Sequence, residues 1–101
     1  MTGIYALIPS PWRQMGLLTL EEVAIRCSLH PELVRRLMIL GLIDPEESTG
    51  EWFRPEVTLR LQRILRLRRD LGVNYNAAAL VLDLLDRIDA LETRLRHFES
   101  L

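Results

Sequence analysis

The chain has 101 residues, of which 49% are apolar and 27% are charged, and its formal net charge is -1. This length predicts one domain with a modest core, and the near-zero charge excludes a bulk electrostatic attraction to nucleic acid or membrane. Cys27 has no second cysteine for an internal disulfide, and no apolar run approaches the roughly 18 residues of a membrane span. We therefore expect a cytoplasmic protein.

The first predicted element is a short edge strand at Ile4–Ile8, because its residues are β-prone and a proline follows them. A loop is expected from there to Gly16. Thr19 and Glu22 have the spacing of a capping box, which predicts a helix over Leu20–Cys27 with the cysteine in its core face.

A second helix is predicted to begin at Pro31, since proline suits the first helical position, and to end at Gly41. Its inward face is expected to consist of Leu33, Leu37 and Leu40. Two short helices joined by a tight turn form a helix-turn-helix pattern. Leu42–Ile43 and Trp52–Arg54 flank a turn-rich segment and predict the two strands of a small β-wing. We expect Trp52, beside Phe53, to attach this wing to the next helix, and the alternative is that its ring anchors a partner.

Pro55 begins a third predicted helix with the inward residues Val57, Leu61, Ile64 and Leu71. The opposite side carries Arg60, Arg63, Arg66 and Arg69. This arginine row fits nucleic acid, or it fits ion pairs with Asp83, Asp86 or Asp89. Arg68 falls on the apolar face, so a buried stem and a paired head are expected.

Gly72 supplies the positive φ that ends the third helix, and Asn74 is a suitable cap for the next one. The chain then continues without glycine or proline, which predicts one long last helix. We therefore divide the chain into a winged head at 1–73 and an interaction helix at 74–101, within one domain overall.

The last helix carries a heptad stripe that predicts a homodimer, formed by Val81, Leu84, Ile88, Leu91, Leu95 and Phe98. Arg87 and Arg94 take g positions and Glu92 and Glu99 take e positions, which favours parallel pairing. The stripe covers fewer than three heptads, so burial of Leu80, Leu82 and Leu85 is also expected. Packing of the stripe on the chain's own head or on another partner is the alternative.

The sequence shows no catalytic or cofactor-binding pattern. His30 and His97 lack partners at informative spacing, and His30 beside a helix start indicates a capping or surface role. Cys27 with one histidine does not make the three or four closely spaced ligands of a metal site. We therefore expect no enzyme, no metal and no cofactor.

The element order resembles the MerR-type winged-helix regulators and favours a mainly α fold with a small β-wing and a long C-terminal helix. The residues of this resemblance are Leu18-Thr19, Val23-Ala24, Pro31-Glu32, Arg35, Gly41-Leu42-Ile43 and Leu71-Gly72. A narrower resemblance to the CbpM chaperone-modulator family runs through Trp52-Phe53, 67–75, Ala79-Leu80 and 84–88. The narrower resemblance implies a partner: that family binds the J-domain of a DnaJ-like (CbpA-type) co-chaperone and restrains its stimulation of DnaK. The MerR resemblance implies an antiparallel dimer.

The charge of the wing distinguishes a protein partner from DNA. Met38 and Ile39 lie off the predicted core face, and the wing between Asp44 and Glu51 is acidic, which would repel phosphates. J-domains carry a basic helix that such a wing complements. The predicted partner-binding residues are Arg35, Met38, Ile39, Glu46, Glu47 and Glu51. The alternative is a MerR-like transcriptional regulator that binds DNA through Arg35, Arg36, Arg54, Arg60 and Arg63.

Overall fold

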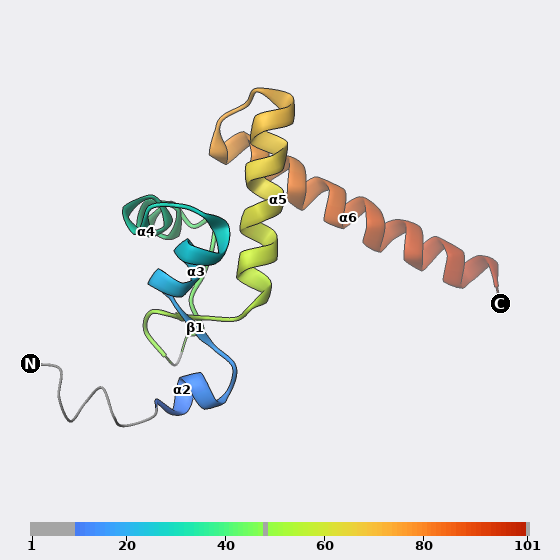
Figure 1. The fold of residues 1–101 in the computed structure, drawn as a ribbon. Helices are drawn as coiled ribbons and strands as arrows, with labels where there is room; N and C mark the ends of the chain where they lie inside the picture. The colour runs from blue at the N-terminus through green and yellow to red at the C-terminus, as the bar shows by residue number, and fades with distance from the viewer. Residues whose placement is uncertain (1–9, 48, 101) are drawn as a thin grey trace, which may run out of the picture. The chain divides into compact units, whose positions relative to one another are not determined.

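The computed structural model describes residues 10–47 and 49–100, and it is mainly helical with one two-stranded antiparallel sheet and a long C-terminal helix, as predicted (Figure 1). The elements are α2 (Pro11–Gln14), β1 (Leu18–Thr19), α3 (Leu20–Cys27), α4 (Pro31–Ile39), β2 (Trp52–Phe53), α5 (Glu56–Leu71) and α6 (Tyr75–Glu99). The predicted strand at Ile4–Ile8 lies outside the described residues. The chain forms two compact units that divide between Leu61 and Gln62, within α5.

Helix α2 occupies a segment that was predicted to be a loop, and that prediction was wrong. The Ser10 hydroxyl accepts a hydrogen bond from the Trp12 backbone N–H at 3.2 Å, and Pro11 takes the first turn. A serine cap followed by proline is a helix-start signal that a four-residue helix shares with longer ones. The chain leaves α2 through Gly16 at a φ of +84°.

Helix α3 has the predicted bounds and the predicted capping box. The Thr19 hydroxyl accepts from the Glu22 N–H, and the Glu22 carboxylate accepts from the Thr19 N–H. The helix buries Leu20, Val23, Ala24 and Cys27, which confirms the cysteine as a core residue.

Helix α4 begins at Pro31 with His30 as its cap: the imidazole Nδ1 accepts from the Glu32 N–H at 3.1 Å, as a capping role predicted. Its inward face differs from the prediction. Val34 and Leu37 are buried, Leu33 is half-buried and Leu40 is 52% exposed. Leu40 follows the last helical residue as the C-cap, so the predicted periodicity extended past the end of the helix.

Strand β2 pairs with β1, in the register Leu18↔Phe53 and Thr19↔Trp52. The predicted strand at Leu42–Ile43 was wrong, because these residues bend away from α4 after Gly41, whose φ is +79°. Ile43 is nevertheless buried. The wing is therefore a loop ahead of β2, and the strand opposite β2 comes from the segment before α3.

The second unit contains the end of α5, a short joint and α6. Gly72 has a φ of +68°, and the Asn74 side chain accepts from the Ala77 N–H at 2.8 Å, which confirms both predicted roles. Arg68 is exposed, so its stem is not buried as predicted, but its guanidinium lies 4.4 Å from the centre of the Tyr75 ring.

Burial in α5 and α6 follows the predictions in part. Leu61, Ile64 and Leu82 are buried as predicted, and Ala78 and Ala79 are buried with them. Leu71, Leu80 and Leu85 are exposed, contrary to the prediction. Leu71 is the last residue of α5, and every described residue of α6 after Leu82 is exposed. No described helix is long and apolar enough to cross a membrane.

Candidate functional site

The wing is the acidic loop before β2, and it is held by backbone contacts. The Glu46 N–H donates to the Trp52 carbonyl at 2.8 Å. The Thr49 hydroxyl lies 2.8 Å from the Glu46 carbonyl and 3.2 Å from that of Trp52, and it donates to this pair of oxygens. Because these bonds attach the loop to β2, they set where its acidic side chains leave the backbone of the first unit.

Two arginines of the first unit are paired with wing carboxylates. Arg35 of α4 lies 3.0 Å from Glu51, and Arg54, directly after β2, lies 2.7 Å from Glu46. The Glu46 carboxylate raises the pKa of Arg54. Exposed pairs of this kind contribute little to folding stability. These pairs instead hold parts of the fold in place, because the Arg35–Glu51 pair links α4 to the wing.

Exposed apolar side chains lie at the end of α4, beside this pair in the sequence. Ile39 is 75% exposed and Met38 is half-buried, which confirms that at least one of the two faces solvent. Leu40 extends the apolar area. We use the name α4–wing surface for Arg35, Met38, Ile39, Glu46, Glu47 and Glu51. The Arg35–Glu51 pair joins its two parts, helix and loop.

The residues of the alternative DNA site are mostly engaged within the chain. Besides the pairs of Arg35 and Arg54, the Arg60 Nε–H donates to the Leu42 carbonyl at 3.1 Å. Arg63 lies 3.3 Å from Asp86, so one arginine of the row forms the ion pair that was the alternative to nucleic acid. Arg36 is exposed.

The Cys27 thiol is buried in the core of the first unit. Burial raises the pKa of the Cys27 thiol, so it stays protonated at neutral pH, and its Sγ lies 3.7 Å from the Thr58 carbonyl. Within the described ranges, no three His, Cys, Asp or Glu side chains are grouped so as to hold a metal ion.

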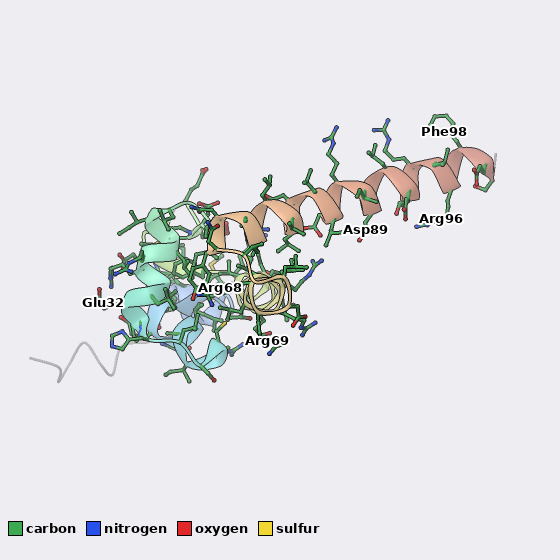
Figure 2. All side chains as sticks on the ribbon, turned by 90° about the horizontal axis from the view of Figure 1, so that it is seen from above. Glu32, Arg68, Arg69, Asp89, Arg96 and Phe98 are labelled. Atoms are coloured by element: carbon green, nitrogen blue, oxygen red, sulfur yellow. The ribbon has the colours of Figure 1, made fainter. Side chains whose placement is uncertain are left out.

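The heptad stripe of α6 faces solvent along most of its length. Val81 is half-buried, and the other five residues, from Leu84 to Phe98, are 48% to 68% exposed. Figure 2 shows Phe98 projecting from one side of the helix and Asp89 and Arg96 from the opposite side. The exposed part of α6 is therefore amphipathic.

Comparison with known proteins identifies the family to which the chain belongs. The profile of a family described as "MerR HTH family regulatory protein" matches residues 18–100. Two relatives from Coxiella burnetii (strains Dugway 5J108-111 and RSA 331), each called chaperone modulatory protein CbpM, are 36% identical over 84 residues, which is 81% of this chain and 79% of theirs. A CbpM from Citrobacter koseri is 32% identical over 75 residues, 72% of this chain and 74% of its own.

The chain belongs to the CbpM-type chaperone modulatory proteins of the MerR helix-turn-helix family. No solved structure gives a significant match. This membership places the chain among regulatory proteins and not enzymes, as the sequence predicted. Helices α3 and α4, which are joined by a short turn, lie within the matched residues.

The sequence analysis missed one part of this region. Trp12 and Met15 of α2 approach the wing, because both line a notch that Glu46 and Arg54 also line. The signal that would have found them is Ser10-Pro11, which indicates a helix start.

Proposed function

We propose that the chain is a cytoplasmic, non-enzymatic modulator that binds the J-domain of a DnaJ-like (CbpA-type) co-chaperone and inhibits its activity. The observation that carries the proposal is the α4–wing surface, which combines the carboxylates of the wing with an exposed apolar side chain of α4, Ile39, and in which the Arg35–Glu51 pair links helix and loop. The relatives' shared name, chaperone modulatory protein, supports a partner within a chaperone system.

The charge of the wing supports a basic partner. Asp44, Glu46, Glu47 and Glu51 outnumber the paired arginines, Arg35 and Arg54, so the region stays negative after the internal pairs are counted. A negative patch accelerates encounter with a positive one and fixes its orientation, while the apolar area supplies affinity. A basic J-domain helix has the complementary charge.

Charge reversal of the wing tests this proposal. We expect Glu46→Lys/Glu47→Lys to weaken J-domain binding by on the order of tenfold at low salt and to flatten its salt dependence. The matched control is Glu21→Lys/Asp89→Lys, which makes the same change in net charge at exposed positions outside the α4–wing surface. Calorimetric titration measures both variants, and equal affinities for the wing variant and the wild type would contradict the proposal.

We also propose that residues 74–101 act as an interaction helix and pair two copies of the chain through the heptad stripe. An isolated helix is only marginally stable in water, yet α6 exposes every described residue after Leu82. A second copy covers the stripe with the same surface. The e and g charges favour parallel helices, whereas the MerR resemblance favours antiparallel ones. We propose the antiparallel arrangement, because a small number of exposed charge pairs contributes little to the stability of the dimer.

A MerR-like DNA-binding regulator is the second candidate, since the matching family profile describes regulatory helix-turn-helix proteins. Arg36 is exposed on α4 and available to DNA. A mobility-shift assay across salt concentrations distinguishes the two functions. Binding to a defined operator that falls steeply with salt would favour the regulator, and its absence together with J-domain binding would favour the modulator.

A further inference from the structure

A notch in the first unit lies where α2, the wing and the start of α5 meet. Its apolar lining comes from Trp12, Met15, Leu17 and Pro55. Its charged lining is Glu46, Glu56 and Arg54, and Arg54 is paired with Glu46 at 2.7 Å. Met15 is 69% exposed, although methionine is apolar, and Trp12 is half-buried. The notch therefore has a solvent-exposed apolar wall with carboxylates beside it.

The wall that α2 contributes is fixed to the rest of the unit. Arg13 of α2 lies 2.8 Å from the Glu22 carboxylate of α3, and its guanidinium lies 5.5 Å from the centre of the Trp52 ring of β2. One arginine thus connects α2 to a helix and to the sheet. Because α2 is tied at this point, the notch is preformed and does not have to be assembled when a partner arrives.

A second hollow adjoins the notch and is acidic. It is lined by Asp44, Pro45, Glu46, Glu47 and Gly50, so Glu46 belongs to both hollows. An apolar site and an anionic site therefore lie next to each other on one surface. Their complement is a segment that carries an apolar side chain next to cationic ones.

The openness of the notch argues against a small-molecule ligand. The notch encloses about 290 Å³ but is open to solvent, whereas sites for small molecules cover most of the surface of the ligand. A single apolar side chain needs less space, and the rest of a protein partner would cover the opening.

We infer that the notch receives an apolar side chain from a basic segment of the protein partner, and that neighbouring cations of this segment contact the acidic hollow. This inference rests on the proposed function and extends its contact area from α4 and the wing to α2. Met15 is the main apolar contact, because it is exposed and its flexible thioether side chain adapts to the shape of a partner.

The test is a calorimetric titration of the full chain with the J-domain of a DnaJ-like protein. Met15→Asp should bind at least tenfold more weakly, and the loss should persist at high salt because the contact is apolar. Met15→Leu should bind like the wild type. Ile25→Asp is the matched control, because Ile25 is 77% exposed on α3 and lines neither hollow. Circular dichroism checks that each variant is folded.

The outcomes separate this inference from the function on which it rests. Wild-type affinity in Met15→Asp, with the wild type binding the J-domain, would overturn the inference and leave the proposed function intact. A wild-type chain that binds no J-domain would overturn both. Loss of self-association in Met15→Asp, measured by sedimentation, would assign the notch to a second copy and overturn the inference as well.

Discussion

Trp52 and Phe53 are neighbours in β2, and the two-residue period of a strand directs their side chains to opposite faces. Phe53 is fully buried, whereas Trp52 is half-buried with the Arg13 guanidinium over its ring. The sequence predicted that Trp52 attaches the wing to the next helix, because of its size. Of the two aromatic residues, Phe53 is the one that lies in the core.

Alanine substitutions distinguish the two aromatic residues. Phe53→Ala should lower the free energy of unfolding by about 3–5 kcal/mol, since it leaves a cavity in a closed core. Trp52→Ala should cost clearly less, because water already reaches part of the ring. Urea denaturation followed by circular dichroism measures both variants, and a larger loss for Trp52→Ala would show that the tryptophan is the main attachment.

Single residues were predictable where a local rule decides their role. Thr19, His30 and Asn74 each cap a helix through a hydrogen bond within three residues, so the sequence alone contains both partners. Leu40 and Leu71 were placed in the core because they continue an apolar period, and Leu80 and Leu85 because the short heptad stripe needs further burial. Their exposure depends on where a helix ends and on what packs against it, and neither is contained in the period.

At the scale of elements, α3 and α6 were predicted well because caps and breakers define their ends. The pairing of β1 with β2 was not predicted, because it joins segments on either side of the helix-turn-helix. Two-residue strands carry almost no pattern of their own. The acidic wing was recognisable from composition, but its contribution to a notch with α2 depends on that long-range pairing.

The capping box of α3 predicts a specific pH dependence. The Arg13 guanidinium and the Thr19 backbone and hydroxyl groups lower the pKa of Glu22 below its ordinary value of 4.5. A carboxyl with a lower pKa in the folded chain stabilises folding when ionised. This contribution is complete above about pH 5 and is lost as the pH falls through the lowered pKa of the folded state.

Glu22→Gln should therefore remove part of the acid sensitivity. Gln preserves the capping-box geometry but does not ionise, so the free energy of unfolding of this variant should fall less between about pH 5 and pH 3 than that of the wild type. Thermal unfolding across this pH range measures the difference. Glu21→Gln, at the neighbouring exposed position, is the control. Identical slopes for Glu22→Gln and the wild type would contradict the assignment.

At the scale of the whole molecule, self-association through α6 is a direct prediction. Ile88→Asp/Leu95→Asp places two charges within the stripe and should convert a dimer into a monomer at micromolar concentration, because buried unpaired carboxylates are costly. Ala90→Asp/Thr93→Asp adds the same charge outside the stripe and should leave the dimer intact. Sedimentation velocity measures all three proteins, and a monomeric wild type would contradict the dimer.

Family membership was predictable from the order of elements and from the residues around the α5–α6 joint, which lie close together in the sequence. The proposed docking surface was identifiable only in part. Glu46, Glu47 and Ile39 are identifiable by charge or by position on a helix, but the ion pairs that orient the carboxylates form between α4, the wing and the end of β2. These pairs require the folded chain.

The pairs Arg35–Glu51 and Arg54–Glu46 have a consequence for selectivity. Phosphate groups that approached these arginines would compete with carboxylates that are already in place at high local concentration. A cationic partner would be favoured by the same pairs. The carboxylates are already ordered before it arrives, and they can exchange the guanidinium of an arginine for a cation of the partner. On the proposed docking surface, these four side chains would therefore favour a polycation over a polyanion.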